Sequence, residues 1–498
     1  MSRKTKKKPV RTYEKHTLTE IIPVKGESEL NLAFMEAALR QMVASFKPAI
    51  GPRFGPGRPR ILPSFALWNG LIICVMRGFT TQSEVWRLLR DKGLWTYQPF
   101  NISDDAVYKR LQTEGSAYLE QLFEHIKSAL RVHLTPFTQS FNEQLPLAPF
   151  ASGVYALDVT SLDKVKRSLP SLRKVANGDD LLYKGKLACL FNVRAQQWEK
   201  IKFIETIHEN EKISAREMID GLPDGSLVLA DLGYFSFKWF DDLTDKGLFY
   251  VSRVREKVTY TIIYTFYEGD CGEFFDGVVW LGNNENSQAK HAVRLVRFCV
   301  GQIVYTYITN VLNPLILSMS AIATIYARRW DIEMAFNLGK THLKLHLIWS
   351  AHLNVILAQI WAVLIVSQII QALRVEIAAR AGVSIFDVSL ELLIKEAPEL
   401  ARLGIDPVKR FVDNGRVLRY IRPSSRTEIK TPTINEQLIK QLPRELILER
   451  EAHYAPLPKS GRDKSTAAAK VPKTKAKRGG QGRAKVERAP PTPQLATL

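Results

Sequence analysis

The chain has few cysteines, and their spacing offers neither a disulfide framework nor a metal site. Its 498 residues include four cysteines, none of them in a CxxC pair. This excludes a disulfide-stapled scaffold and a cysteine zinc site, and it fits a reducing compartment. No GxxxxGK[ST] phosphate loop occurs, so an ATP-driven motor is unsupported. The HLKLH run at 342–346 lacks the glutamate of an HExxH zinc motif.

Long uninterrupted apolar runs are also missing. The most membrane-like stretch, residues 353–373, is broken by five amide or hydroxyl side chains: Asn354, Gln359, Ser367, Gln368 and Gln371. These favour a buried core helix over a membrane span. The charged N-terminus leads into no apolar run, which argues against a secretory signal. We therefore expect a cytoplasmic protein with no membrane partner.

Acidic residues are scarce relative to basic ones. There are 70 Lys and Arg against 50 Asp and Glu, which gives a net charge of +20. Residues 1–12 carry six basic side chains and no acid, and residues 456–498 carry eleven basic and two acidic ones. Such arms can bind a polyanion such as DNA. A tail that only improves solubility has the same composition, so both interpretations stay open.

The N-terminal third contains features typical of DNA-binding proteins. Gly57-Arg58-Pro59 resembles the centre of an AT-hook, in which Arg58 would enter the minor groove; Pro56 stands where an arginine is expected, and a simple linker is the alternative. The pattern then predicts helices at 63–77, 81–92 and 103–115.

The third of these helices opens with Ser103 as an N-cap and carries Lys109 and Arg110. Together with the helix before it, it suits a helix-turn-helix whose second helix enters the major groove. Any small helical bundle would give the same pattern.

From residue 152 the pattern changes to short β runs. Strands, helices and further strands in this order predict a layered α/β domain with a mixed sheet: strands at 153–158, 187–193 and 201–206, a helix at 211–220, a strand at 226–231, a helix at 234–246 and a strand at 248–252. Residues 257–310 are almost wholly strand-like and look like an all-β insertion. Long helices resume from about 319 to 381, and a smaller helical region follows to about 450.

Two of the predicted strands end in an aspartate that continues an apolar face. Asp158 follows Val154 and Ala156 by the period of two, and Asp231 follows Leu227 and Leu229 in the same way. A carboxylate at the mouth of a buried sheet is costly unless it is paired or holds a metal. Either residue alone could simply begin a turn or cap a helix. Three acids in the polar loop after the first strand compete with Asp158 as ligands, although solvation is their default: Asp163, Asp179 and Asp180.

A third carboxylate lies in the helical stretch from 319. Helical periodicity places four polar side chains on one narrow stripe beside an apolar seam: Tyr326, Arg329, Glu333 and Lys340. It places Asp331 away from that stripe, so Glu333 is the expected buried carboxylate. A solvated salt-bridge face is the usual explanation of such a stripe. The apolar seam makes that explanation weaker here.

Three carboxylates from two strands and one helix form a hard-oxygen site suited to Mg²⁺ or Mn²⁺. Two such ions can activate a water or a 3′-hydroxyl and steady the leaving oxygen of a phosphoryl displacement. Phosphodiester cutting and joining fits both this site and the basic arms.

The run Tyr326-Ala-Arg-Arg-Trp-Asp-Ile-Glu-Met-Ala-Phe-Asn-Leu-Gly-Lys340 resembles the YREK signature, Y-x2-R-x3-E-x6-K, of bacterial DDE transposases of the insertion-sequence-four family. All four positions and all three spacings match. The segments Asp158-Val-Thr-Ser-Leu162 and Ala230-Asp-Leu-Gly-Tyr-Phe235 resemble the family's two aspartate blocks. The resemblance covers roughly residues 150–375.

This resemblance implies a ribonuclease-H-like core interrupted by a β-rich insertion. It maps Asp158, Asp231 and Glu333 to the metal-binding DDE triad. It maps the other three signature residues, Tyr326, Arg329 and Lys340, to contacts with the phosphates of the transposon end. In relatives a tryptophan of the insertion can stack on a flipped base. Trp280 is the only candidate in this insertion, and core packing explains it at least as well.

The expected function is a DNA transposase that binds the terminal inverted repeats of its own element, cleaves them and joins them to target DNA. The expected cofactor is a pair of Mg²⁺ or Mn²⁺ ions. A homodimer in a synaptic complex and a bacterial, nucleoid-associated location follow from the resemblance. Two alternatives remain: a ribonuclease-H-like nuclease that cuts without joining, and an inactive relative retained as a DNA-binding protein. Intact carboxylates at all three positions argue against the second.

These features divide the chain into seven expected segments: a basic arm (1–27), a helical DNA-binding domain (28–150), the first part of the catalytic core (151–255), a β-rich insertion (256–312), the second part of the core (313–381), a helical C-terminal region (382–455) and a disordered basic tail (456–498).

Overall fold

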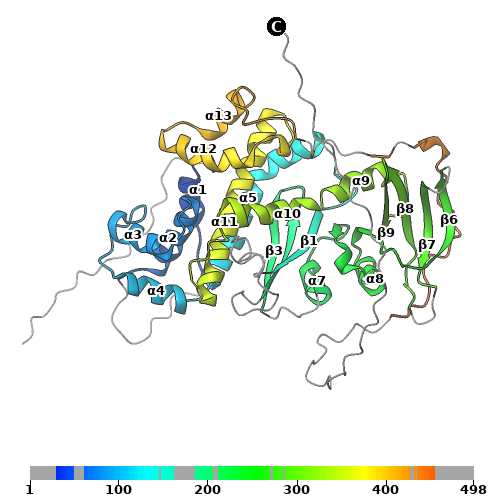
Figure 1. The fold of residues 1–498 in the computed structure, drawn as a ribbon, viewed down its shortest axis with the longest axis horizontal. Helices are drawn as coiled ribbons and strands as arrows, with labels where there is room; N and C mark the ends of the chain where they lie inside the picture. The colour runs from blue at the N-terminus through cyan, green and yellow to red at the C-terminus, as the bar shows by residue number, and fades with distance from the viewer. Residues whose placement is uncertain are drawn as a thin grey trace, which may run out of the picture. The chain divides into compact units, whose positions relative to one another are not determined.

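The computed structural model describes residues 30–49, 61–144, 147–161, 185–205, 211–269, 273–283, 287–350, 352–424, 426, 431–432 and 434–454. Arg58, the three loop aspartates, the basic arm 1–27 and the tail 456–498 lie outside these residues. Helices from both ends of the described chain accompany one large sheet (Figure 1). The architecture is the mixed α/β class that the sequence predicts.

The sheet has nine strands in the order β3-β2-β1-β4-β5-β9-β8-β7-β6. In its first half, β1, β4 and β5 are parallel to one another, β2 is antiparallel to β1, and β3 is antiparallel to β2. Helices α7 and α8 make the connections into β4 and β5, as parallel pairing requires. The bounds are β1 Val154–Ser161, β2 Lys186–Asn192, β3 Gln197–Ile204, α7 Glu211–Ile219, β4 Leu227–Ala230, α8 Phe237–Asp245 and β5 Phe249–Arg253. This order of strands and helices is the predicted one.

The β-rich stretch continues the same sheet. Its strands are antiparallel, and the last of them, β9, pairs with β5 through Val251 opposite Thr309. The sequence predicts the strands of this stretch but not their union with the core sheet. Pairing with β9 leaves β5 without a free edge, which protects its backbone groups. The bounds are β6 Tyr260–Glu268, β7 Phe275–Leu281, β8 Val293–Val300 and β9 Ile303–Thr309.

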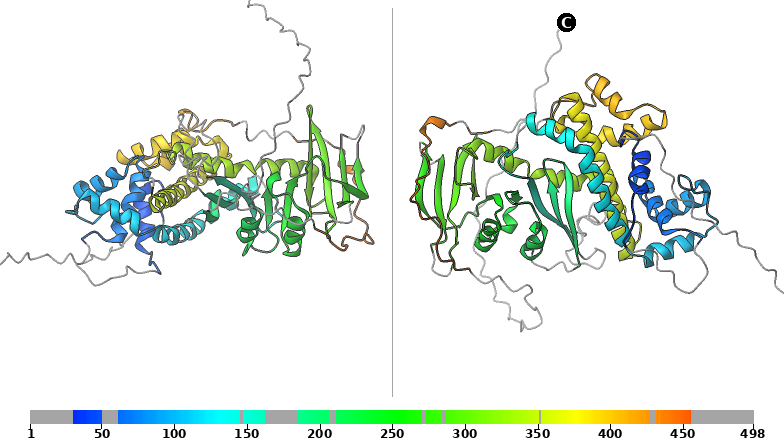
Figure 2. Two further views of the ribbon diagram at one scale, coloured as in Figure 1. Left: turned by 60° about the horizontal axis from the view of Figure 1, so that its bottom comes forward. Right: turned by 180° about the vertical axis from the view of Figure 1, so that it is seen from behind.

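The two faces of the sheet belong to separate apolar cores. Val154, Ala156 and Leu229 lie in a core shared with the helices α9 to α11, and we call this side the first face. Tyr155 and Leu157 lie in a core shared with α7 and α8, and we call this side the second face. Figure 2 shows these two sets of helices on opposite sides of the strands. Because side chains alternate along a strand, Asp158 falls on the first face.

The run from Tyr326 to Lys340 is not one continuous helix, although the predicted stripe assumes one. The stretch from 319 to 381 consists of several helices, as predicted. It contains α9 Met319–Ala327, α10 Trp330–Asn337, a π-helical turn Leu338–His342 and α11 Leu353–Ala381. Between α9 and α10, the N–H groups of Arg328, Arg329 and Asp331 each bond the carbonyl three residues earlier. Such tight turns advance more than 100° per residue, so the helical count from Tyr326 does not carry across them.

Helix α11 is the central helix of the described chain. It packs against α2, α4, α5 and α13, and most of its side chains are buried. It is the one helix among the described residues that is long and apolar enough to cross a membrane by length and composition; a core helix passes the same test. The predicted burial of 353–373 is confirmed. The helices before the sheet are α1 Met35–Ala44, α2 Ser64–Met76, α3 Gln82–Arg87, a π-helical turn Leu88–Lys92, α4 Asp104–Thr113 and α5 Ala117–Gln144.

Helical structure ends earlier at the C-terminal side than the sequence suggests. Helices α12 Leu390–Arg402 and α13 Pro407–Asn414 are followed by a mostly extended stretch. Its last part, which we call the C-terminal strap (residues 439–454), packs leucines onto the β6–β8 region and bonds its backbone to that of residues 288–292. The prediction of a helical region to 455 is therefore wrong for the strap, which forms bridges to the insertion in place of helical bonds.

Candidate active site

Asp158 lies within β1, three residues before its end, and beside Asp231, which directly follows the parallel strand β4. Leu157 of β1 is in register with Ala230 of β4, and each aspartate is the next residue. The N–H of Val159 donates to Asp158 Oδ1 at 2.8 Å. Both side chains continue the first face, as the alternation predicts. Both are partly buried.

Glu333 reaches the same region from α10, which packs over β1 and β2. Its carboxylate accepts a hydrogen bond from Arg329 Nη2 at 2.9 Å, and a third of its side chain (34%) is exposed. The Arg329 side chain is buried, at 8% exposure. Among the described residues, the cation bonded to Glu333 is thus Arg329, which lies in the turn just before α10.

The carboxylates act on one another electrostatically. Burial raises the pKa of Asp158 to about 6; the Val159 N–H and Arg329 oppose this rise, and the negative charges of Glu333 and Asp231 add to it. Burial alone would lower the pKa of Arg329, but Tyr326, Asp231 and Glu333 raise it. Charges affect each other in this way only at short range or in a low dielectric. The site thus has more negative charge than Arg329 neutralises.

The donor set of this site fits a divalent cation, although the side chains do not form a closed ligand cluster. Among the described residues, no group of three or more His, Cys, Asp or Glu side chains is arranged to hold a metal ion. Glu333 is turned to Arg329. Carboxylate oxygens are nevertheless the ligands that Mg²⁺ and Mn²⁺ prefer. A bound cation would favour the ionised form of Asp158, whose pKa is raised by burial and by the neighbouring negative charges.

The other three signature residues surround the strand ends. The Tyr326 hydroxyl points to the carbonyl of Ala230, at the limit of a hydrogen bond (3.5 Å), and burial raises the pKa of Tyr326 to about 12. Lys340 lies on the π-helical turn and donates from Nζ to Thr160 Oγ1 at 2.7 Å. The structure therefore gathers Tyr326, Arg329 and Lys340 around Asp158 and Asp231, although they do not share one continuous helix.

The assignment of the buried carboxylate on α10 is wrong. Asp331 is buried, at 2% exposure, whereas Glu333 is partly exposed. Asp331 Oδ2 accepts from Gln196 Nε2 at 2.7 Å and from Arg328 Nε at 2.8 Å. The tight turn at Arg328 shifts the phase of α10 relative to α9, and this brings Asp331 to the inside. Partial exposure of Glu333 suits a residue that must meet a ligand.

Trp280 lies apart from the carboxylates. It is on β7, five strands along the sheet from β1, which at the usual strand spacing is roughly 24 Å. Its ring is covered by the Arg450 guanidinium of the C-terminal strap, at 4.7 Å from the ring centre. The structure does not bring Trp280 to the candidate site, and its stacking role stays a prediction.

The two basic residues of α4 differ in exposure. Lys109 is 73% exposed and pairs with Asp105 at 3.1 Å. Arg110 is largely buried and bonds the Leu62 carbonyl, Ser64 Oγ at 3.0 Å and Glu114 at 2.6 Å. The Ser103 hydroxyl accepts from the Ala106 N–H, which confirms the predicted cap. Lys109 is thus placed on the surface, while Arg110 ties α4 to the start of α2.

Two further side chains of the site, Thr160 and Arg253, were not predicted from the sequence. Thr160 lies two residues after Asp158 and so on the same face, which the alternation could have shown. Arg253 ends β5, the third parallel strand, and its guanidinium lies over the rings of Tyr305 at 5.9 Å and Tyr326 at 6.0 Å. The predicted strand stopped one residue before it, and only the neighbouring strand β9 supplies Tyr305.

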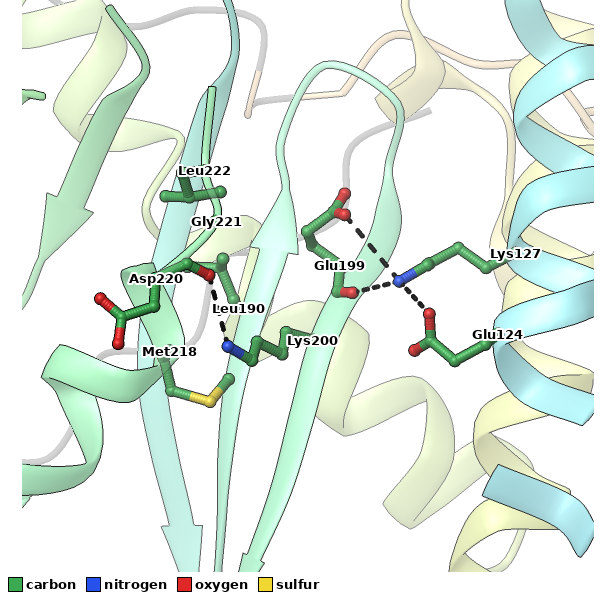
Figure 3. Close-up of a pocket in the computed structure, with 9 residues that line it drawn as sticks. All are labelled: Glu124, Lys127, Leu190, Glu199, Lys200, Met218, Asp220, Gly221 and Leu222. Atoms are coloured by element: carbon green, nitrogen blue, oxygen red, sulfur yellow. Dashed lines mark hydrogen bonds and ion pairs between the residues drawn. The ribbon is translucent and has the colours of Figure 1, made fainter. Parts of the chain in front are cut away.

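A pocket of about 290 Å³ lies elsewhere, between α5 and the β2–β3 hairpin (Figure 3). Its lysines are engaged: Lys127 Nζ donates to the Glu199 carbonyl at 2.6 Å and pairs with Glu124 at 2.6 Å. Leu190 and Met218 at its wall belong to the core of the second face. This pocket therefore contains none of the candidate carboxylates.

Residues 152–369 match a family model described as the Transposase DDE domain. The matched segment contains Asp158, Asp231, Glu333 and the remaining signature residues, and the match supports a DDE transposase family and a DNA transposase function for this part of the chain. Among solved structures, the chain is similar to the piggyBac transposase synaptic complex with hairpin DNA, at 8% identity and a TM-score of 0.32, over 82% of this chain and 84% of that chain. A search of curated proteins gave no match.

Proposed function

We propose that this chain is a DNA transposase of the YREK-signature, insertion-sequence-four family. It would bind the inverted-repeat ends of its own element, cleave them and join them to target DNA as a homodimer. The observation that carries the proposal is the in-register placement of Asp158 and Asp231 on adjacent parallel strands, with Glu333 above them on α10. All three lie within the segment that matches the transposase model.

The order of the strands supports a ribonuclease-H-like core. Strands β3-β2-β1-β4-β5 form a mixed sheet in which the first three strands in sequence are antiparallel neighbours, and β4 and β5 extend it in parallel. In α/β sheets, ligands bind beyond the carboxyl ends of the parallel strands. Asp158 lies in the last half of β1, and Asp231 directly follows β4.

Asp158, Asp231 and Glu333 are the residues that would hold Mg²⁺ or Mn²⁺. When bound, the ions would supply Lewis-acid stabilisation of the phosphate and an activated water or 3′-hydroxyl. Arg329 holds Glu333 in the absence of a metal and adds a buried cation beside the reacting phosphate. Lys340, seated on Thr160, adds a second cation. Tyr326 fixes the position of α9 against the end of β4.

The experiment uses purified protein, Mg²⁺ and linear DNA that carries the chain's own gene with flanking sequence. Wild-type protein is compared with Glu333→Ala and with Glu391→Ala, an exposed glutamate in the first turn of α12 that serves as the matched control. We expect breaks at a pair of inverted repeats with wild type and Glu391→Ala, and a loss of about 10³-fold or more with Glu333→Ala. Cleavage by Glu333→Ala at the wild-type rate would contradict the proposal.

The same reactions separate the proposal from its alternatives. Products in which the freed ends are joined to a second DNA identify a transposase, and breaks without joining identify a nuclease. Tight, salt-sensitive binding with no breaks in any variant would point to an inactive DNA-binding relative.

A further inference from the structure

Helices α12 and α13 form a helix-turn-helix at the C-terminal side of the described chain. Four residues, 403–406, join them, and Gly404 takes the left-handed conformation (φ 72°) that such a turn needs. Asp406 caps α13 by accepting from the Lys409 N–H at 3.1 Å. Pro407 stands at the first position of α13, where its missing N–H costs nothing. The local sequence therefore specifies both the turn and the start of the second helix.

The second helix and the turn after it display a group of basic side chains. Four of them are exposed, and none forms an ion pair with any residue that the structure describes: Lys409, Arg416, Arg419 and Arg422. We call these four residues the C-terminal basic patch. One acid, Asp413, lies among them. Lys409 lies on α13, and Arg416 follows the end of that helix by two residues.

The turn that carries the patch is firmly held. The rings of Phe411 and Tyr420 are stacked with centres 4.4 Å apart, and the Ile421 N–H bonds the Gly415 carbonyl at 2.9 Å. A Cβ at Gly415 would lie 2.1 Å from the Phe411 carbonyl oxygen, so only glycine fits there. Ile421 also bridges to Val388. The cations are thus presented by a folded turn and not by a loose chain.

Several other exposed arginines, unlike those of the patch, have acidic partners. Arg77, Arg87 and Arg402 are each paired with a glutamate at 2.6 to 2.7 Å. Arg419 also has a left-handed backbone conformation (φ 57°), which is uncommon for residues other than glycine. Holding like charges together without counter-charges is unfavourable unless a polyanion neutralises them. The periodic phosphates of DNA supply such a partner.

We propose that α13 and the following turn bind the phosphate backbone of double-stranded DNA through Lys409, Arg416, Arg419 and Arg422. This inference rests on the proposed function only in taking DNA as the polyanion. In a helix-turn-helix the second helix faces the DNA. Helix α13 fits this role better than α4, whose exposed side chains include Asp104, Asp105 and a Lys109 that is already paired.

The test measures binding of the full chain to a labelled duplex of about 30 base pairs and arbitrary sequence, in EDTA, between about 50 and 200 mM KCl. The patch variant carries Lys409→Gln, Arg416→Gln, Arg419→Gln and Arg422→Gln. The control variant loses the same charge at exposed basic residues elsewhere, none of them ion-paired with a described residue: Lys47→Gln, Lys257→Gln, Lys440→Gln and Arg444→Gln.

We expect the slope of log affinity against log salt to flatten by about 3 to 4 in the patch variant, since each phosphate contact contributes about 0.9. The control variant should keep most of the wild-type slope. Equal losses in both variants, or no loss in the patch variant, would overturn the inference. A single substitution, Asp413→Asn, provides an independent check that does not depend on four simultaneous changes, and it should tighten binding. Unchanged or weaker binding by Asp413→Asn would count against the patch.

This result is separable from that of the cleavage experiment. Binding is measured without metal and without transposon ends, so a chain that never cleaves DNA can still show the patch. Normal cleavage together with unaltered binding by the patch variant would overturn this inference alone.

Discussion

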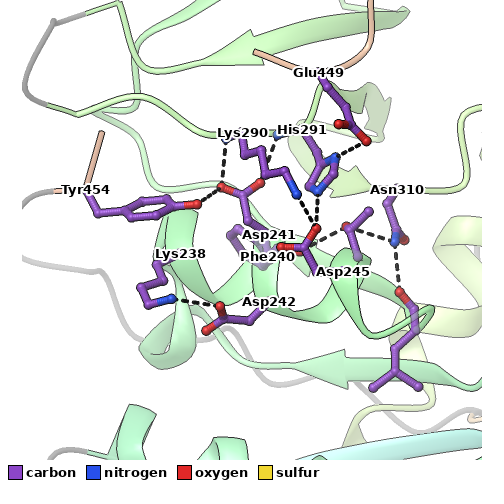
Figure 4. A network of polar contacts seen from close by, with 12 residues as sticks. Lys238, Phe240, Asp241, Asp242, Asp245, Lys290, His291, Asn310, Glu449 and Tyr454 are labelled. Carbon is purple, nitrogen blue, oxygen red and sulfur yellow. Dashed lines mark hydrogen bonds and ion pairs between the residues drawn. The ribbon is translucent and has the colours of Figure 1, made fainter. Parts of the chain in front are cut away.

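Two groups of acidic side chains lie on opposite faces of the same sheet, and they are neutralised in different ways. On the second face, α8 carries Asp241, Asp242 and Asp245 (Figure 4). Asp241 accepts from the N–H groups of Lys290 and His291 at 2.8 and 3.0 Å and from the Tyr454 hydroxyl at 2.9 Å. Each of its oxygens therefore has a donor.

The other two acids of α8 are paired with cations. Asp242 contacts Arg216 and Lys238, each at 2.9 Å. Asp245 accepts from Lys290 Nζ at 2.6 Å and lies 2.7 Å from His291 Nε2. These contacts join α8 to the β7–β8 connection and to the C-terminal strap. The acids of α8 therefore link elements that are distant in the sequence.

On the first face, Asp158, Asp231 and Glu333 share one arginine, Arg329, which bonds only Glu333 among the three. Burial raises the pKa of Asp158, and the negative charges of Glu333 and Asp231 add to this rise. Proximity of acids therefore does not by itself indicate a metal site. The informative feature is a group of carboxylates with more negative charge than the cations bonded to it neutralise.

The strongest test of this distinction lies on α10, where a buried and a partly exposed acid are two residues apart. Asp331→Ala removes the partner of the buried Arg328, and leaving a buried charge unpaired costs about 3 to 5 kcal/mol. Glu333→Ala should lower the free energy of unfolding by less than Asp331→Ala does, because Glu333 is partly exposed and Arg329 keeps the nearby negative charge of Asp231. Urea unfolding of both variants measures the difference. Equal destabilisation would show that the two acids do not differ in role.

These two residues also mark the limit of sequence reasoning. Alternation along β1 and β4 was enough to place Asp158 and Asp231 on one face, because strand periodicity survives any change in the surroundings. The prediction that Glu333, and not Asp331, is the buried carboxylate assumes one unbroken helix from Tyr326. The tight turn at Arg328 is stabilised by Gln196, which lies in the hairpin between β2 and β3, and no local pattern links the two.

Contacts with residues distant in the sequence also explain why the C-terminal strap is extended and not helical. Residues 439–454 contain apolar side chains at irregular spacing, and a helix was a reasonable expectation. Their partners are backbone groups of residues 288–292, far away in the sequence. Trp280 was singled out for its type, but its ring is covered by Arg450 from this strap. Contacts of this kind become visible only in the folded chain.

A second prediction uses the pH dependence of stability in the absence of divalent cations. The pKa of Asp158 is about 6 in the folded chain and 3.8 ordinarily, so the unfolded chain ionises first as pH rises. The free energy of unfolding should therefore fall between about pH 4 and pH 6, by up to about 3 kcal/mol. Asp158→Asn removes this fall and should be more stable than wild type at pH 7 while losing cleavage. Urea unfolding at several pH values in EDTA measures it.

Asp241→Asn is the matched control on the second face. An amide cannot accept hydrogen bonds at both ends, so a backbone N–H of Lys290 or His291 would lose its acceptor, at a cost of about 1 to 3 kcal/mol. This variant should be less stable than wild type and should keep cleavage activity. A wild-type pH profile for Asp158→Asn, or stabilisation by Asp241→Asn, would erase the contrast between the faces.

The smallest expected effect concerns the tyrosine that joins the strap to α8. Tyr454→Phe deletes the hydroxyl that donates to Asp241 Oδ2, and a partly exposed hydrogen bond of this kind contributes about 1 kcal/mol. The loss should be local, with faster amide exchange at residues 449–454 and unchanged exchange in β1 and β4. Tyr250→Phe is the control, because the buried Tyr250 hydroxyl has no hydrogen-bond partner within the described part of the chain and its removal should be neutral or stabilising. If both substitutions had the same effect, the Tyr454 hydroxyl would not anchor the strap, and the N–H groups of Lys290 and His291 alone would stabilise the Asp241 carboxylate.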